Sequence, residues 1–176
     1  NVKLNIKEQD LIKYLGEQIK SFTTPADEKG LTLNFEPKEV KLNAFIDPGM
    51  FESIINNLLH NAVKFTQKGK VTLRAMKQEN FAVIEVEDTG IGVPKDLQEI
   101  IFDPFRQASE GHSRSFEGTG LGLTIVKKYM SLMNGTITLS SKKEDLVAGI
   151  AGGSTFVLKL PLTEHIVENV IRTHWV

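Results

Sequence analysis

The order of strand-like and helix-like segments is the feature that most limits the folds open to this chain. Segments 11–22, 48–65 and 121–133 carry apolar residues at helical spacing. Strand-like segments come in neighbouring pairs, 70–76 with 81–87 and 136–140 with 155–160. Paired strands with helices between them are typical of an α+β sandwich of two layers, here with about seven strands and three substantial helices.

The remaining expected elements are shorter. Alternation of apolar and polar residues predicts strands at 2–6, 31–35 and 42–46, and a short helix is expected at 96–101. Residues 105–117 carry almost no apolar side chains, which predicts a mobile loop. Residues 142–153 form a long connection between the last two strands.

Composition excludes several classes of protein. The 176 residues have a formal net charge of −1 and no cysteine, which excludes a disulfide scaffold, a cysteine-ligated zinc site and a thiol nucleophile. No long basic run points to nucleic acid, and no apolar stretch approaches the ~20 residues of a membrane span. Because the chain begins at Asn1, we expect an excerpt of a longer protein or a processed form.

Three polar residues interrupt the apolar stripe of segment 48–65. Asn57, Asn61 and Lys64 follow one another at i, i+4 and i+7, so they share one face of the predicted helix. Two asparagines are costly in a helix. One interpretation is a solvent-facing stripe; the other is a site where a carboxamide oxygen binds Mg²⁺ and the lysine meets a phosphate.

Two glycine-rich segments are candidates for ligand contact. Asp88 and the glycines at 90 and 92 directly follow an apolar strand, where the carboxylate can accept a hydrogen bond from an exocyclic amine. The alternative there is a plain turn. Residues 118–122 open segment 121–133, where backbone N–H groups favour an anion, or simply form a loop and helix cap. Neither the Rossmann nor the Walker A spacing occurs.

In their order and spacing these segments resemble the N, G1, F and G2 boxes of sensor histidine kinases. The boxes read NNLLHNAVKFT at 56–66, DTGIG at 88–92, FDPF at 102–105 and GTGLG at 118–122. The resemblance runs from the helix at 11 through GGSTF at 152–156 to Pro161. It implies the Bergerat ATP-binding fold of the GHKL superfamily: a mixed, mostly antiparallel sheet backed by three helices, with a mobile ATP lid. The implied catalytic domain is 1–161, and 162–176 is a tail or linker of unknown role.

The resemblance also implies ATP and Mg²⁺ as ligands and gives roles to individual residues. Asp88 is expected to bind the adenine amine with ordered water, Gly90 and Gly92 to leave room beside the base, and Asn61 to ligate Mg²⁺. Asn57 and Lys64 are expected at the triphosphate. Further implied ATP contacts are Phe105 at the lid, the backbone of Gly118, Thr119, Gly120, Leu121 and Gly122, and Thr155 near the adenine water. Within the lid, the candidates for the γ-phosphate are Arg106, Gln107, His112 and Arg114.

The implied activity is transfer of the γ-phosphoryl group to a histidine on a separate helical dimerisation domain. A response regulator would act downstream, and the implied location is cytoplasmic, whether or not the parent protein is anchored in a membrane. His60 is expected to be a partly buried helix residue rather than an acceptor. The alternatives are a regulatory nucleotide-binding module and a GHKL-type ATPase. Gyrase-type and chaperone-type ATPases carry a glutamate base where this chain has Asn57, which disfavours hydrolysis.

Overall fold

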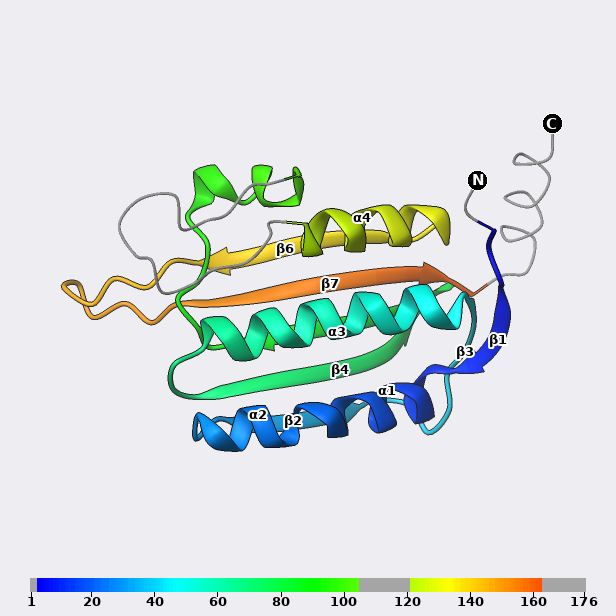
Figure 1. Cartoon of the computed structure of the whole chain (residues 1–176), viewed down its shortest axis with the longest axis horizontal. Coiled ribbons are helices and arrows are strands. Elements are labelled where there is room, and N and C mark those ends of the chain that lie inside the picture. The colour runs from blue at the N-terminus through cyan, green and yellow to red at the C-terminus, as the bar shows by residue number, and fades with distance from the viewer. Residues whose placement is uncertain (1–2, 105–120, 163–176) are drawn as a thin grey trace.

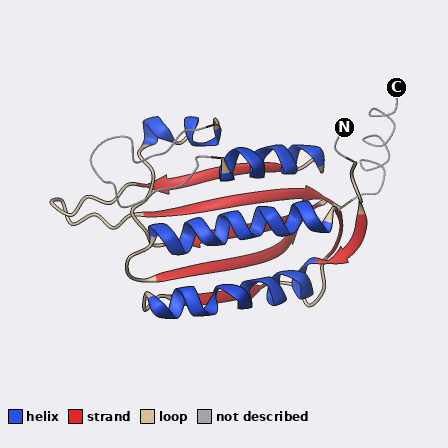
Figure 2. Ribbon diagram, in the orientation of Figure 1, coloured by secondary structure: helices blue, strands red, loops and turns tan. Residues whose placement is uncertain are grey.

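In the computed structural model, which describes residues 3–104 and 121–162, a five-stranded sheet lies behind a layer of helices (Figures 1 and 2). Strand β2 pairs with β4 in parallel, and all other neighbours in this sheet are antiparallel. The order across the sheet is β2 (Thr32–Pro37), β4 (Lys70–Gln78), β5 (Phe81–Asp88), β7 (Gly153–Pro161) and β6 (Thr136–Lys142). The predicted two-layer α+β fold with a mixed, mostly antiparallel sheet is therefore confirmed.

Four α-helices form the second layer in the described part of the chain. Helix α3 (Pro48–Phe65) lies over the middle of the sheet, α1 (Leu11–Ile19) and α2 (Thr23–Glu28) over the β2 edge, and α4 (Gly122–Leu132) over the β6 edge (Figure 1). The described chain also has three short 3-10 helices: η1 (Lys20–Phe22), η2 (Lys95–Leu97) and η3 (Ile100–Phe102). None of the described helices has the length and apolar character needed to cross a bilayer.

Helix α3 forms where its sequence pattern predicts it. Asp47 caps its N-terminus by accepting the Met50 N–H at 3.1 Å, and Pro48 occupies the first turn, where no N–H is needed. At the other end Lys29 donates to the carbonyls of Val63 at 2.6 Å and Lys64 at 3.1 Å. The stripe that α3 buries against the sheet is Met50, Phe51, Ile54, Ile55, Leu58, Leu59, Ala62 and Val63.

Three expected elements differ from the structure. The first strand is β1 (Lys7–Asp10), which pairs with β3 (Asn43–Ile46); residues 3–6 have no partner strand, although Leu4 and Ile6 still pack against the core. The helix predicted at 11–22 ends at Ile19 and is followed by η1 and α2. The short helix expected at 96–101 is two 3-10 turns, η2 and η3. In each case hydrogen-bond partners, not apolar spacing, set the boundary.

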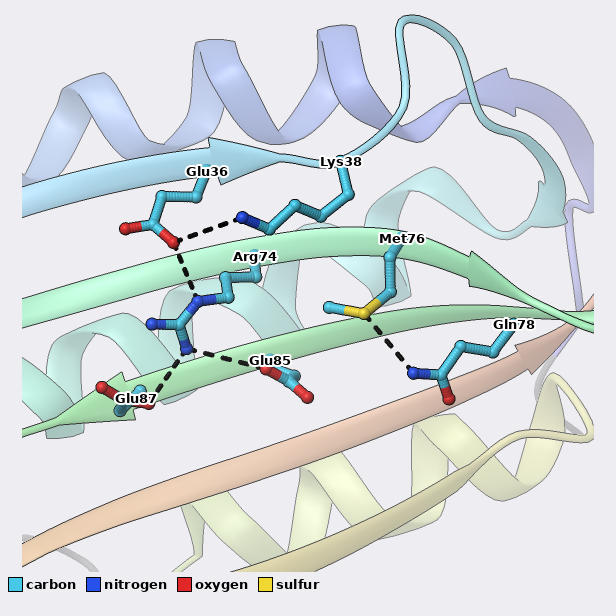
Figure 3. Close-up of polar contacts among 7 residues, drawn as sticks. All are labelled: Glu36, Lys38, Arg74, Met76, Gln78, Glu85 and Glu87. Atoms are coloured by element: carbon cyan, nitrogen blue, oxygen red, sulfur yellow. Dashed lines mark hydrogen bonds and ion pairs between the residues drawn. The ribbon is translucent and has the colours of Figure 1, made fainter.

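The two faces of the sheet have opposite character. Alternate residues of β4 and β5, such as Leu73 and Val86, are fully buried beneath the helices. On the other face Arg74 donates to Glu36 and Glu87, both at 2.9 Å, and lies 3.6 Å from Glu85 (Figure 3). Charged side chains thus cover the face that the helices leave open.

The long connection between β6 and β7 is itself a hairpin. Asp145 and Ile150 exchange two backbone hydrogen bonds, and Asp145 Oδ1 accepts the N–H groups of Val147 and Ala148 at 3.0 Å. Glu144 N–H donates to the Ile91 carbonyl at 2.8 Å, which ties the base of this hairpin to the segment after β5.

Candidate functional site

Asp88 ends β5 and points from the sheet toward the helix layer. It pairs across β4 with Val71, is 8% exposed, and its Oδ1 accepts the Gly90 N–H at 2.8 Å. Burial raises the pKa of this carboxyl to about 6, although N–H groups of Gly90 and Ser154 oppose the rise. Above that pH the group is a buried carboxylate that only accepts hydrogen bonds.

Gly90 and Gly92 are needed for close packing of the backbone beside Asp88. A Cβ at Gly90 would collide with the Phe65 carbonyl at the end of α3, and one at Gly92 with the Lys142 carbonyl at the end of β6. Gly92 also has a φ of 69°, in the left-handed region. The glycines therefore bring this loop against α3 and β6, a role that the sequence alone did not predict.

The structure keeps Asn57, Asn61 and Lys64 on one half-buried side of α3. Asn57 donates its amide to the Ser53 carbonyl at 2.7 Å. No described residue forms a hydrogen bond with the side chain of Asn61, and its carboxamide oxygen is of the kind that binds hard cations. Lys64 Nζ lies 5.3 Å from the centroid of the Phe65 ring.

Other metal chemistry finds no support in the part of the chain that the structure describes. No group of three or more His, Asp or Glu side chains there is placed to hold a metal ion. His60 is exposed, contrary to the expected partial burial. Asn61 offers one amide oxygen, which suits a cation that takes its remaining ligands from water and phosphate, as Mg²⁺ does.

Helix α4 brings the end of the glycine-rich segment to α3. A Cβ at Gly122 would lie 2.6 Å from the side-chain oxygen of Asn57, and Leu121 precedes the helix without a capping side chain. Among the described residues no side chain caps this first turn, and N–H groups at the start of a helix suit an anion. The expected site residues Phe105, Gly118, Thr119 and Gly120 lie outside the described residues, as do Arg106, Gln107, His112 and Arg114.

The segment before the undescribed residues 105–120 is anchored to α4 and β7. Thr124 Oγ1 donates to the Phe102 carbonyl at 2.9 Å, and the Phe102 ring packs edge-on against Phe156 with centroids 6.3 Å apart. Lys127 Nζ lies 5.8 Å from the centroid of the same ring. Phe102 thus joins η3 to the helix that carries Gly122.

Thr155 is the one expected site residue within the described ranges that the structure places elsewhere. In the pairing of β5 with β7 it lies opposite Glu87, whereas Ser154 lies opposite Asp88. Successive strand residues face opposite sides, so Thr155 faces the charged side of the sheet and Ser154 shares the side of Asp88. Ser154 is 7% exposed and was missed. The sequence could have predicted this side, because Ser154 precedes Phe156, Leu158 and Leu160 at intervals of two residues, and these three side chains are buried.

Comparisons with known proteins show the family to which the chain belongs. Residues 46–164 match the family described as histidine kinase-, DNA gyrase B-, and HSP90-like ATPase. The chain is 34% identical over 171 residues to sensor histidine kinase RcsC of Escherichia coli K12, covering 87% of this chain and 17% of RcsC. It is 35% identical over 162 residues to the aerobic respiration control sensor protein ArcB of the same strain, covering 90% of this chain and 20% of ArcB. The chain thus spans about a sixth to a fifth of these relatives.

Solved structures show the same fold. Full-length ShkA, crystallised in complex with AMPPNP, matches with a TM-score of 0.79 and 27% identity, over 92% of this chain and 32% of ShkA. The catalytic domain of histidine kinase ThkA matches with a TM-score of 0.77 and 23% identity, over 91% of this chain and 99% of that domain. The chain therefore belongs to the histidine kinase-, DNA gyrase B-, and HSP90-like ATPase family and corresponds to the catalytic domain of sensor histidine kinases.

Proposed function

We propose that this chain binds Mg·ATP and transfers its γ-phosphoryl group to a histidine on a separate helical phosphoacceptor domain. A response regulator would then receive the group from that histidine. The observation that carries the proposal is the buried Asp88 carboxylate within a frame that also holds Asn61 and the N-terminus of α4. Membership of the family and the AMPPNP bound by the related ShkA support the same reading.

Each part of this frame suits one part of the nucleotide. The Asp88 carboxylate accepts a hydrogen bond from an exocyclic amine, which adenine has at its six position. The first turn of α4 presents backbone N–H groups to phosphate oxygens. Asn61 would hold Mg²⁺ through its amide oxygen, and the ion would supply charge neutralisation at the phosphates when bound.

The proposed nucleophile is a histidine of the separate acceptor domain. The only histidine within the described ranges, His60, directly precedes Asn61 in α3 and so points to another side of the helix than Asn57 and Asn61. In the proposed reaction a nitrogen of the acceptor histidine forms a bond to the γ-phosphorus while the bond to the bridging oxygen of ADP breaks. This chain contributes positioning and hydrogen-bond donors, which is where most of the catalysis of phosphoryl transfer lies.

The ATPase alternative has a chemical objection at Asn57. Its amide donates to the Ser53 carbonyl, and a carboxamide cannot take a proton from water. A regulatory module that binds nucleotide without transferring phosphate is separated from the kinase only by experiment.

The test is phosphoryl transfer in trans. The chain is incubated with Mg²⁺ and γ-labelled ATP, with and without a helical acceptor domain taken from a relative such as RcsC. Label on the acceptor histidine supports the proposal. Bound nucleotide with no transferred label supports the regulatory module, and phosphate release without acceptor supports the ATPase.

Two substitutions control this test. Replacing the acceptor histidine with glutamine must abolish labelling. Asp88→Asn should remove nucleotide binding and labelling together, whereas Asp27→Asn makes the same chemical change at an exposed position of α2 and should leave both unchanged. Full labelling by the Asp88→Asn chain would contradict the proposed place of the base.

A further inference from the structure

Ser141 makes three short polar contacts on β6, two strands away from Asp88. It pairs with Ser154 across β6 and β7, and Ser154 in turn pairs with Asp88 across β7 and β5. The Ser141 hydroxyl oxygen lies 2.7 Å from the Val93 nitrogen, 2.8 Å from the Gly153 carbonyl oxygen and 2.8 Å from the Ser154 hydroxyl oxygen. Ser141, Ser154 and Asp88 thus lie side by side in a row across β6, β7 and β5.

These contacts determine where the hydroxyl protons lie. A carbonyl oxygen only accepts and a backbone N–H only donates, so Ser141 must donate to Gly153 and accept from Val93. Its single proton is then used. The 2.8 Å contact between the two serine hydroxyls is therefore a hydrogen bond that Ser154 donates to Ser141. The opposite arrangement would leave two oxygens at 2.8 Å, Ser141 and Gly153, with no proton between them.

The segment that bears Val93 is held in place by a second tie. Gln98 Nε2 donates to the Val93 carbonyl and to the Ser141 carbonyl, both at 2.9 Å. Val93 is therefore bound to β6 directly through its N–H and, by way of the Gln98 amide, through its carbonyl group. Because the N–H that Ser141 accepts cannot turn away, the orientation of the Ser141 hydroxyl is preset.

We propose that Ser141 is a positioning residue which holds the Ser154 proton away from the base, so that the buried end of the nucleotide site can only accept hydrogen bonds. The inference rests on the proposed function. Ser154 then offers lone pairs beside the Asp88 carboxylate, directly or through a bound water. A site end that only accepts hydrogen bonds favours a base that donates one there, as adenine does with its amine. It disfavours a base with a carbonyl oxygen at the same position.

The experiment compares two nucleotides that differ at that place. ADP carries an amine at the six position of its purine and IDP carries a carbonyl there. Calorimetric Kd values of the chain for both give a discrimination ratio. We expect the wild-type chain to prefer ADP, and Ser141→Ala to lower the ratio about three- to ten-fold, because the freed Ser154 hydroxyl turns and donates to the IDP carbonyl. The change should come mainly from tighter IDP binding.

Matched variants separate this role from a structural one. Ser141→Thr keeps the hydroxyl and should keep the ratio, and Ser140→Ala, on the exposed side of the same strand, should leave it unchanged. If Ser141→Ala does not fold, Ser154→Ala tests the same point, since it removes the acceptor and should weaken ADP binding while IDP binding changes little.

The outcomes of this experiment are distinct. A wild-type chain that binds neither nucleotide overturns the proposed function and this inference with it. A wild-type chain that prefers ADP, with the ratio unchanged in Ser141→Ala or in Ser154→Ala, overturns the inference alone and leaves the proposed function intact. A ratio that falls in Ser141→Ala and is retained in Ser141→Thr supports the inference.

Discussion

Asn57 of α3 and Gly122 of α4 are in direct contact: a Cβ added to Gly122 would lie 2.6 Å from the Asn57 side-chain oxygen. Asn57 is held from the other side by its hydrogen bond to the Ser53 carbonyl at 2.7 Å. A Cβ at Gly122 would therefore have to displace an amide that this hydrogen bond holds. This contact joins the asparagine face of α3 to the helix N-terminus proposed to bind phosphate.

Gly122→Ala should weaken nucleotide binding more than it changes stability. Alanine favours a helix over glycine by up to about 1 kcal/mol, which offsets part of the cost of the collision. The displaced Asn57 amide should lower ADP affinity about ten-fold, close to the loss of 1.4 kcal/mol of binding free energy. Calorimetric titration gives the affinity and thermal unfolding the stability. Gly49→Ala is the control, because its Cβ would lie 3.5 Å from the nearest atom, an ordinary contact. Unchanged ADP affinity in Gly122→Ala would mean that the contact has no role in binding.

Asp88 should make the chain less stable as the pH rises from about 4 to about 6. The folded carboxyl has a pKa of about 6 against an ordinary value of 3.8. Between these values the folded state holds a proton that the unfolded state has lost, so unfolding becomes easier with rising pH and the cost is fully present above pH 6. A shift of this size corresponds to about 3 kcal/mol. Asp88→Asn should remove this slope and raise the free energy of urea unfolding at pH 7.5. An identical pH profile in both proteins would refute the assignment.

Nucleotide affinity should follow the same titration in the opposite sense. The carboxylate accepts the hydrogen bond of the base, so ADP affinity of the wild-type chain should fall as the pH drops below about 6, where Asp88 gains its proton. Titrations from pH 7.5 to 5.0 measure this fall. Asp27→Asn serves as the reference with an intact site. Affinity that is flat across this range would show that the ionised form of Asp88 is not the one that binds.

Arg74→Met should destabilise the fold without affecting the nucleotide. Arg74 bonds Glu36 and Glu87, and its loss leaves three carboxylates facing one another on neighbouring strands. We expect a loss of about 1 kcal/mol at pH 7. The hydrogen bond from Arg74 lowers the pKa of Glu36 below its ordinary value of 4.5, so the difference from wild type should shrink once the pH falls below 4.5. Urea unfolding measures both effects. Weaker ADP binding in this variant would contradict the separation of the two sheet faces.

Lys29→Met should loosen the end of α3 next to the site. Lys29 donates to two carbonyls in the last turn of α3, and removing the ammonium group leaves those acceptors with less compensation. The expected cost is about 1 kcal/mol in unfolding free energy. Lys13→Met, at an exposed position of α1, is the matched control. Hydrogen exchange at Val63 and Lys64 should rise in Lys29→Met alone; equal exchange in both variants would argue against the cap.

The sequence by itself determined the elements whose signals are local. Helix α3 follows from its apolar stripe and the Asp47–Pro48 start, and the spacing of Asn57, Asn61 and Lys64 placed them on one side of it. The hairpin of β4 and β5 follows from alternation on either side of a polar turn. The sequence motifs identified the family, because they depend on residue order rather than on contacts.

Tertiary structure alone decided what depends on partners distant in the chain. The parallel pairing of β2 with β4, the pairing of β1 with β3 and the break after α1 at Ile19 all come from contacts that no local pattern specifies. Register placed Ser154, and not Thr155, on the side of Asp88, since a shift of one residue reverses every side chain of a strand. Ser141 gained its proposed role in the same way: a serine on β6 acquires a fixed proton only when Val93 and Gly153 are folded against it.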